Sequence, residues 1–183
     1  MNIIETSLKA AYIIEPKVFD DERGFFYEGY SEKLFEEKTG IDFKVVQLNF
    51  SKSSYGVLRG LHFQKEPMAQ AKLVSVIAGE VWDVAVDLRK DSPTYGNWHG
   101  EILSSDNKKR FFIPKGFAHG FIALKDHTEL MYAVDNFYSQ ENDTGVRFDD
   151  PKLNIDWKLS EDKLILSEKD KLLPFAHSVS IVR

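Results

Sequence analysis

Short segments rich in β-branched and aromatic residues recur along the chain, separated by turn-forming residues. Gly79, the Asp106–Asn107 pair and the stretch at 114–116 are such turn formers. The spacing leaves little room for intervening helices, which favours a β-sandwich or barrel over an alternating α/β fold. We expect Gly79 to turn a hairpin between the second and third strands. The predicted strands are 44–50, 72–78, 80–89, 110–114, 119–124 and 129–134.

Two segments have helical character. The segment 31–40 predicts a short helix, with Ser31 as its N-cap and Gly40 just after its end. The segment from Ser160 to Lys171 is expected to hold a second short helix. Repeats, low-complexity stretches and linkers rich in Pro, Gly or Ser are absent from the sequence, so we expect a single domain over residues 1–183.

Polar side chains occupy strand faces that simple alternation would assign to a core. Gln47 and Asn49 share one face of a predicted strand, and Asp83 and Asp87 share one face of another. A barrel whose interior holds a polar ligand gives this pattern, and so does an antiparallel sheet with one solvated face. The polar residues on these faces include His, Lys, Tyr, Asp and Gln rather than the Lys, Glu and Thr of a wetted face. Their aggregate therefore favours a lined pocket.

Composition narrows the class of protein. With 183 residues, 43% of them hydrophobic, the chain can bury a sizeable core. The net charge of -5 argues against a general nucleic-acid binder, although a few arginines in a pocket could still hold a phosphate. The absence of cysteine excludes disulfides, thiolate catalysis and cysteine-based metal sites. Residues 1–18 do not resemble a signal peptide and no apolar run could span a bilayer, so we expect a cytoplasmic protein without membrane contact.

One candidate chemical motif lies at 59–64. His62 and Gln64 share a strand face, and Arg59 has the opposite parity unless Gly60 sits in a β-bulge. Histidine titrates near neutrality and is the commonest general base. A hydrogen-bonded core histidine is the alternative interpretation. The neighbouring arginine, which suits bidentate phosphate binding, favours a functional site.

A second motif has the spacing Pro-x-Gly-x-x-His at 114–119. It resembles the second motif of the cupin superfamily, whose members are small β-barrels with a ligand-lined interior. Many cupins bind a metal through a His-x-His pair in their first motif, but here His62 is followed by Phe63 and Gln64. Beside His62 and His119 we find no third ligand, so we expect no metal.

Several long blocks, in fixed order from about Arg23 to Asp170, closely resemble the dTDP-4-dehydrorhamnose 3,5-epimerase family. They are DERGFFYE at 21–28, QLNFSKSSYGVLRGLHFQ at 47–64, QAKLVSVIAGEVWDVAVDLRKDSPTYGNW at 70–98, IPKGFAHGF at 113–121 and FDDPKLNIDW at 148–157. The resemblance implies a cupin-type jelly-roll β-barrel with a few short helices and a homodimer with an exchanged N-terminal strand. It also implies a cofactor-independent isomerase that inverts C3 and C5 of dTDP-4-keto-6-deoxy-glucose in dTDP-L-rhamnose biosynthesis.

The resemblance further implies a catalytic role for several residues. His62 is expected to accept a proton and Tyr132 to donate one on the opposite face of the sugar. Asp170, although it lies in a charged SEKDK stretch typical of a surface, is expected to orient the histidine. Lys72 resembles the cation beside the C4 oxygen, where it would stabilise an enolate. Asp83 and His119 are expected to form a second hydrogen-bonded pair near the sugar.

A substrate-binding set is implied in the same way. Its members are Arg59 and Arg23 for the diphosphate, Glu28, Gln47 and Asn49 for the thymidine part, and Tyr138, Asp143 and Lys169 as further ligand contacts. Arg23 and Glu28 are expected to come from the partner subunit. Asp143 stands where the family often has glutamate, and its side chain is one methylene shorter.

Other functions remain open from the sequence. A relative within the same class could invert only C3 or isomerise the keto-sugar. A non-catalytic sugar-nucleotide-binding cupin would need the arginines and pocket aromatics but neither a base nor a proton donor. The presence of both His62 and Tyr132 favours an epimerase over such a binding protein.

Overall fold

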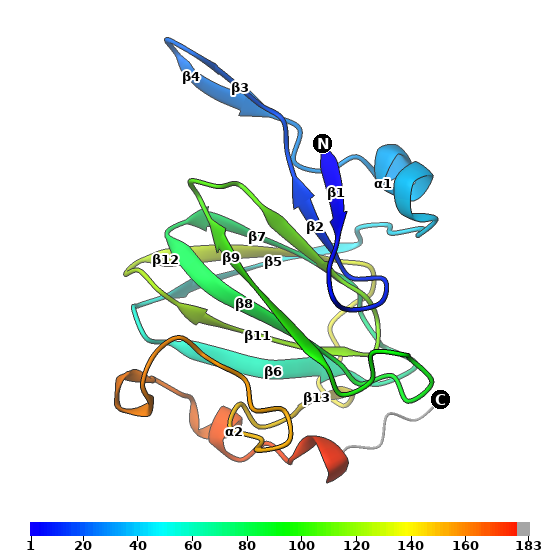
Figure 1. Cartoon of the computed structure of the whole chain (residues 1–183), viewed down its shortest axis with the longest axis vertical. Coiled ribbons are helices and arrows are strands. Elements are labelled where there is room, and N and C mark those ends of the chain that lie inside the picture. The colour runs from blue at the N-terminus through cyan, green and yellow to red at the C-terminus, as the bar shows by residue number, and fades with distance from the viewer. Residues whose placement is uncertain (179–183) are drawn as a thin grey trace.

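The computed structural model describes residues 1–178, which are built mainly from antiparallel β-strands (Figure 1). One sheet has the order β1 (Asn2–Glu5), β2 (Tyr12–Glu15), β10 (Arg110–Ile113), β7 (Lys72–Ala78), β12 (Thr128–Val134) and β5 (Gln47–Ser53). The other has the order β13 (Asp143–Gly145), β6 (Leu58–Gln64), β11 (Phe117–Ala123), β8 (Glu80–Asp87) and β9 (Trp98–Ser104). The predicted mainly β, jelly-roll type of fold with a few short helices is confirmed.

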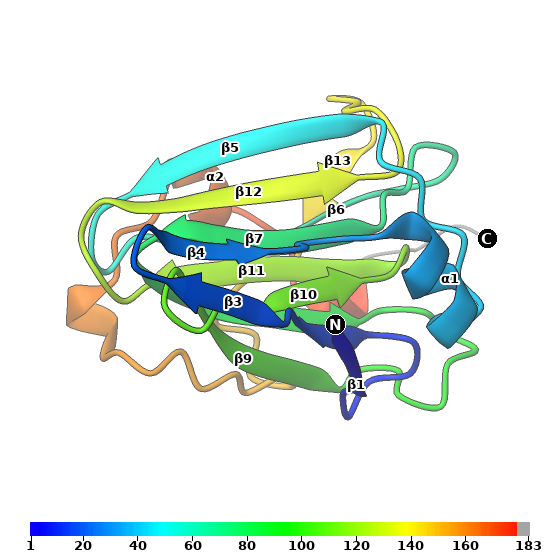
Figure 2. The same cartoon turned by 90° about the horizontal axis from the view of Figure 1, so that it is seen from above.

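The two sheets form separate hydrogen-bonded layers. Figure 2 shows β5, β12, β7 and β10 side by side in the six-stranded sheet. Val74, Phe111 and Ile113 of this sheet meet Leu103 and Phe121 of the five-stranded sheet in a buried apolar cluster. Burial of these apolar side chains holds the layers together, because removing apolar surface from water is the main driving force of folding.

The outer face of the five-stranded sheet is covered by the C-terminal part of the chain. Val84 and Val86 of β8 belong to the same buried cluster as Leu153 and Trp157. This packing carries the short helix α2 (Glu168–Lys171) to a position in contact with β6. The C-terminal segment thereby contacts the side chains of β6.

The expected hairpin at Gly79 is wrong. The strands on either side of it, β7 and β8, belong to different sheets: β7 pairs with β10 and β12, and β8 pairs with β9 and β11. Gly79 has a φ of 81°, and a Cβ there would lie 2.3 Å from the Thr128 hydroxyl. The glycine therefore lets the chain cross tightly between layers, where a larger residue would be strained.

The N-terminal helix is confirmed as α1 (Glu32–Thr39). The Ser31 side chain accepts a hydrogen bond from the backbone N–H of Leu34, and Gly40 ends the helix with a φ of 71°. Residues 1–178 contain no helix long and apolar enough to cross a membrane.

The second predicted helix, at 160–171, is split. A 3₁₀ turn, η1 (Glu161–Lys163), precedes α2, and a further 3₁₀ turn, η2 (Ala176–Ser178), follows. Between η1 and α2 the backbone of Ile165 is hydrogen-bonded to Gly56 and Leu58. These bonds with the start of β6 take up the backbone groups that a continuous helix would use.

The strand predicted at 44–50 begins three residues later and extends to Ser53. Its neighbour β12 ends at Val134, which pairs with Gln47, so the ladder has no further register partner for residues 44–46.

The remaining hairpin, β3 (Val18–Asp21) and β4 (Gly24–Tyr27), forms a small sheet of its own that projects away from the two main layers (Figure 1).

Candidate functional site

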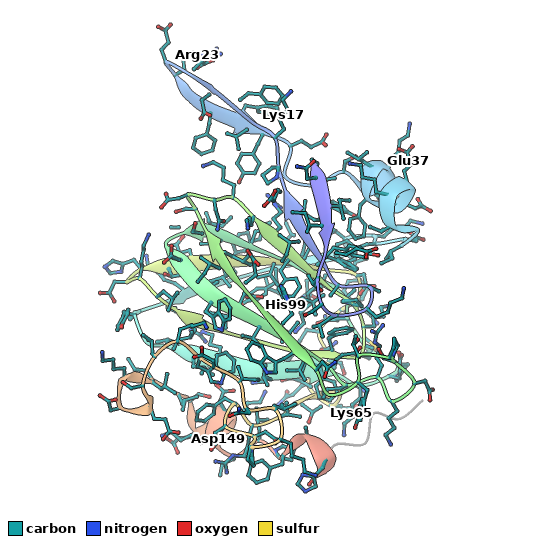
Figure 3. All side chains as sticks on the ribbon, in the orientation of Figure 1. Lys17, Arg23, Glu37, Lys65, His99 and Asp149 are labelled. Atoms are coloured by element: carbon teal, nitrogen blue, oxygen red, sulfur yellow. The ribbon has the colours of Figure 1, made fainter. Side chains whose placement is uncertain are left out.

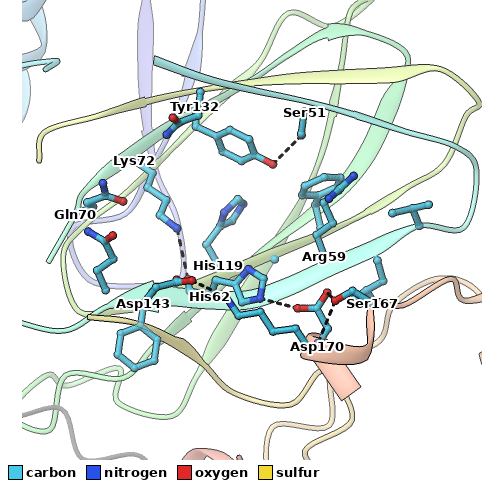
Figure 4. Close-up of a pocket in the computed structure, with 18 of the residues that line it drawn as sticks. Ser51, Arg59, His62, Gln70, Lys72, His119, Tyr132, Asp143, Ser167 and Asp170 are labelled. Atoms are coloured by element: carbon cyan, nitrogen blue, oxygen red, sulfur yellow. Dashed lines mark hydrogen bonds and ion pairs between the residues drawn. The ribbon is translucent and has the colours of Figure 1, made fainter. Parts of the chain in front are cut away.

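A cavity of about 640 Å³ opens between the two sheets (Figure 4). It is lined by residues of β5, β6, β7, β11, β12 and β13 and by the segment that contains α2. The sequence-predicted residues along its wall are Asn49, Arg59, His62, Lys72, His119, Tyr132, Tyr138, Asp143, Lys169 and Asp170. Strands and a helix that are distant in sequence thus bring most of the predicted set together.

The bulge at Gly60 that the parity of Arg59 required is present. Strand β6 pairs His62 with His119 and Arg59 with Phe121, so three steps on β6 match two on β11. Gly60 has a φ of 114°, and a Cβ there would lie 2.6 Å from the Cα atom of the facing strand's glycine. The extra residue shifts the alternation, and Arg59 and His62 both line the cavity.

His62 is held by a carboxylate from α2. Its Nε2 atom lies 2.6 Å from Oδ1 of Asp170, whose other oxygen accepts a 2.7 Å hydrogen bond from the Ser167 hydroxyl. Burial alone would raise the pKa of Asp170, but the hydrogen bonds from His62 and Ser167 bring it below its ordinary value. The carboxylate is therefore charged at neutral pH, and it fixes the orientation of the imidazole ring.

A second histidine–carboxylate pair lies beside the first. His119 Nε2 is 3.0 and 2.9 Å from the two oxygens of Asp83, and both residues are buried. Asp83 does not line the cavity, but it holds His119, which does. His119 pairs with His62 in the strand register. The His119 ring meets the Tyr132 ring edge to face, with centroids 6.0 Å apart.

The opposite wall carries Tyr132 and Lys72 from the six-stranded sheet (Figure 4). The Tyr132 hydroxyl lies 3.1 Å from Oγ of Ser51, and burial raises the pKa of this phenol well above its ordinary value. The Lys72 ammonium is 3.5 Å from the backbone oxygen of His62. Burial lowers the pKa of Lys72 to about 8, although Asp143 and Asp83 act in the opposite direction.

The rim of the cavity is polar. Lys169 Nζ lies 2.6 Å from Oδ2 of Asp143, which also accepts a 3.4 Å hydrogen bond from the Tyr138 hydroxyl. Gln47 donates to Asn49 at 2.7 Å and accepts from the backbone of Tyr138. Gln47 is not itself on the cavity wall and supports two residues that are. Asp143, despite its shorter side chain, lines the cavity.

Arg23 and Glu28 are not brought to this cavity. Arg23 stands at the far end of the β3–β4 hairpin, exposed and paired with Asp21 (Figure 3). Glu28 directly follows β4. Within one chain, the structure therefore separates these two residues from the rest of the predicted set.

Two residues of the site were missed from the sequence, Ser51 and Ser167. Ser51 continues the alternation of Gln47 and Asn49 along β5, so the period-2 pattern contained the signal. Ser167 is the N-cap of α2 and stands three residues before Asp170, a spacing typical of helix starts. Ser51 is hydrogen-bonded to Tyr132 and Ser167 to Asp170, and both partners were predicted as site residues from the sequence.

The described part of the chain offers no group of three His, Cys, Asp or Glu side chains that could hold a metal ion. Instead, His62 and His119 each direct Nε2 to a carboxylate of their own. The cavity thus combines a histidine–carboxylate pair on one wall with a phenol on the other, and a lysine ammonium beside them. Such groups can remove and return protons on opposite faces of a bound ligand.

Known proteins are similar to this chain in sequence and fold. A model of the dTDP-4-dehydrorhamnose 3,5-epimerase family matches residues 5–177. The protein of that name from Shigella flexneri is 52% identical over 170 residues, which are 93% of this chain and 93% of that protein. The crystal structure of dTDP-4-dehydrorhamnose 3,5-epimerase from Elizabethkingia anophelis NUHP1 is 56% identical, with a TM-score of 0.93 over 96% of each chain.

A second solved structure contains a ligand. The dTDP-6-deoxy-D-glucose-3,5-epimerase RmlC from Legionella pneumophila Philadelphia 1, in complex with dTDP-4-keto-L-rhamnose, is 50% identical. It has a TM-score of 0.93 and covers 98% of this chain and 94% of its own. Likeness of this extent in both sequence and fold means that the chain belongs to the dTDP-4-dehydrorhamnose 3,5-epimerase family.

Proposed function

We propose that this protein inverts C3 and C5 of dTDP-4-keto-6-deoxy-glucose, yielding dTDP-4-keto-L-rhamnose for dTDP-L-rhamnose biosynthesis, without a cofactor. The observation that carries the proposal is the placement of His62 and Tyr132 on different sheets around one cavity. Inversion at carbon requires a proton to leave one face and another to arrive on the opposite face. The relative with dTDP-4-keto-L-rhamnose bound supports the choice of sugar.

His62 is the base. C3 and C5 both flank the C4 ketone, so removing either proton gives an enolate with its charge on the C4 oxygen. Asp170 accepts the hydrogen bond from Nε2, which leaves Nδ1 of a neutral ring to take the proton. The carboxylate also stabilises the imidazolium that forms, as in other histidine–carboxylate pairs.

Lys72 stabilises the enolate. Its ammonium group lines the same cavity, beside the base, where the charge on the C4 oxygen would develop. His119, held by Asp83, offers a further polar group at the sugar. Such groups stabilise the charge because they are already in place where it develops.

Tyr132 donates a different proton from the opposite wall. Its raised pKa keeps the phenol protonated at neutral pH, which is the form that a donor needs. After donation His62 carries the proton that it removed, and Tyr132 is a phenolate. The enolate carbon has then been inverted without any redox step.

The remaining predicted residues hold the nucleotide. Arg59 presents a guanidinium at the cavity wall, suited to the diphosphate. Asn49, supported by Gln47, serves the thymidine part. Further contacts are assigned to Tyr138, Asp143 and Lys169.

The homodimer with an exchanged N-terminal strand is also part of the proposal. Phe19 and Phe26 share one face of the β3–β4 hairpin and are 53% and 70% exposed, and Phe50 on β5 is 69% exposed. Large exposed apolar groups of this kind mark interaction surfaces. Exchange of the hairpin would carry Arg23 and Glu28 into the partner's cavity.

Mixing variants tests the exchange. Arg23→Ala and His62→Ala chains are each expected to be nearly inactive alone. Co-folded, they regain activity in an exchanged dimer, because the cavity with an intact His62 receives an intact Arg23 from the other chain. If the hairpin serves its own chain, every cavity lacks one of the two, and the mixture stays inactive. Sedimentation analysis gives the oligomeric state directly.

We further propose a cytoplasmic location, where a nucleotide sugar would be available as substrate. Fractionation of the source cells, with detection of the native protein, tests this. Recovery in the membrane or secreted fraction would contradict it.

The reaction itself is tested by incubating the enzyme with dTDP-4-keto-6-deoxy-glucose in deuterated water and recording proton NMR spectra of the product. Double inversion with deuterium at C3 and C5 is expected. Inversion at C3 alone would identify a 3-epimerase, a product with the keto group moved would identify a ketoisomerase, and binding without exchange would identify a sugar-nucleotide-binding protein. The His62→Ala variant, with unchanged thermal unfolding, is expected to give neither exchange nor product.

A further inference from the structure

The hydroxyl of Tyr132 has a single side-chain partner within residues 1–178, and this is Ser51. The two oxygens are 3.1 Å apart, and both side chains line the cavity (Figure 4). Ser51 lies on β5 and Tyr132 on β12, which pair side by side in the six-stranded sheet. The Ser51 side chain forms no other hydrogen bond in the described part of the chain.

The direction of this hydrogen bond decides which way the phenol proton points. A hydrogen bond between two hydroxyl groups uses the proton of only one of them. If Tyr132 donates to Ser51, its proton is used in that bond and is not directed at a ligand. If Ser51 donates, the Tyr132 proton is free to point into the cavity. A tyrosine that protonates the sugar therefore needs Ser51 as the donor of this bond.

Inverting two centres during one binding event also requires the proton states of His62 and Tyr132 to be restored between the two inversions. After the first inversion His62 holds an extra proton and Tyr132 has lost one. The second centre requires the reverse, so one proton must pass from the histidine side of the cavity to the tyrosine side. A buried phenolate is costly, so the second inversion needs a route by which Tyr132 is reprotonated.

Ser51 provides a path for this proton. Its O–H bond breaks and gives the proton to the phenolate oxygen, while Oγ takes a proton from a water molecule in the cavity. The hydroxide that remains is neutralised by the proton on His62, which restores the neutral base. Ser51 is only partly buried, so water can reach its oxygen.

We propose, building on the proposed function, that Ser51 is a positioning residue that aims the Tyr132 proton into the cavity and reloads Tyr132 between the two inversions. Removing its hydroxyl leaves substrate binding nearly intact, because the diphosphate and thymidine contacts belong to other residues. It slows turnover and makes the enzyme release more sugar that is inverted at one centre only.

The test compares Ser51→Ala with Ser51→Thr, which retains the hydroxyl, and with Ser75→Ala. Ser75 is a buried serine on β7 of the same sheet whose hydroxyl has no partner within residues 1–178, and it lines no part of the cavity. We expect Ser51→Ala to lower kcat by about 10- to 100-fold with KM within about twofold of wild type, a loss typical of impaired proton transfer. Ser51→Ala should also release a larger share of singly inverted product. Ser51→Thr should recover most of the kcat and most of the doubly inverted product, and Ser75→Ala should resemble wild type. An unchanged kcat and product ratio in Ser51→Ala overturns the proposal.

A second measurement does not depend on turnover. Tyrosine labelled with ¹³C at Cζ reports the hydrogen bond of each phenol, and Tyr132→Phe identifies the resonance of Tyr132. We expect that resonance to move in Ser51→Ala and to return towards its wild-type position in Ser51→Thr. A wild-type enzyme that inverts neither centre would refute the proposed function, yet this spectrum would still test Ser51. A resonance unmoved by Ser51→Ala overturns the role of Ser51 whatever the enzyme does.

Discussion

The Nε2 atom of His62 lies 2.6 Å from Oδ1 of Asp170, a residue 108 positions further along the chain. Asp170 reaches the histidine because the C-terminal segment packs over the outer face of the five-stranded sheet and returns at α2. The Ser167 hydroxyl holds the second carboxylate oxygen at 2.7 Å. The base of the proposed reaction is thus positioned by a segment outside both sheets.

Replacing Asp170 by Asn should lower kcat by roughly 10²-fold or more and change KM much less, because the amide cannot stabilise the imidazolium. Steady-state kinetics with the keto-sugar measure both parameters. Asp149→Asn is the matched control, since Asp149 pairs with Arg147 and neither residue lines the cavity. If the two variants had equal kcat values, His62 would not need its carboxylate.

The pH dependence should reflect Lys72. Its pKa is lowered to about 8, so the ammonium is charged below this pH and neutral above it. We expect kcat/KM, which follows the pKa values of the free enzyme, to fall as the pH rises through about 8, because a neutral amine stabilises the enolate less well. A profile of kcat/KM from about pH 6 to about pH 10 measures this.

Lys72→Arg is the companion experiment, because arginine keeps its charge throughout that range. Any activity that it retains should lack the fall near pH 8. The lowered pKa of Lys72 also affects stability. The unfolded chain binds a proton that the folded one lacks, so the free energy of unfolding should rise from about pH 8 towards the ordinary lysine pKa of 10.5. A wild-type kcat/KM that stays flat across the range would contradict the assigned role of Lys72.

Tyr132→Phe should separate proton exchange from inversion. The variant keeps most of the packing and still allows His62 to remove a proton, but it lacks a donor on the opposite wall. The proton then returns from His62 to the face that it left. We expect deuterium exchange at C3 or C5 with little inverted product, measured by NMR on one sample with a melting curve as control. Full inversion by the variant would rule out Tyr132 as the donor.

Arg59→Lys should weaken binding of dTDP by roughly tenfold, or about 1.4 kcal/mol, because lysine lacks the planar fork that matches a diphosphate. Hydrogen bonds to Ser53 and to the backbone of Lys52 hold the guanidinium beside the cavity. Isothermal calorimetry measures the affinity, and Arg147→Lys serves as control because Arg147 does not line the cavity. Equal dTDP affinity in all three proteins would remove Arg59 from the diphosphate site.

Local pattern fixed much of the site in advance. Alternation along β5 separated Gln47 and Asn49 from the apolar side of the strand, and the parity of Arg59 demanded a bulge at Gly60 that the register contains. The caps at Ser31 and Gly40 likewise marked the ends of α1. These features depend on neighbouring residues and strand periodicity, which are written directly in the chain.

Pairing between distant segments could not be obtained in the same way. Gly79 suggested a hairpin, but β7 and β8 lie in different sheets, since a turn former does not specify which partner the next strand will find. Asp170 lies in a charged stretch typical of a surface, yet it is buried against His62. Its role entered through resemblance to a family rather than through local pattern.

By itself, the sequence determined the strand-rich fold, the capped helix, the polar strand faces and the family, because these depend on periodicity, local capping and long blocks of similar residues. The tertiary structure alone decided that Ser51 meets Tyr132, that the segment around Ile165 is extended rather than helical, and that Arg23 stands outside the cavity of its own chain. The physical reason is that each of these depends on which strands pair and which faces pack. Those choices are set by the free energy of the whole chain and not by any short segment of it.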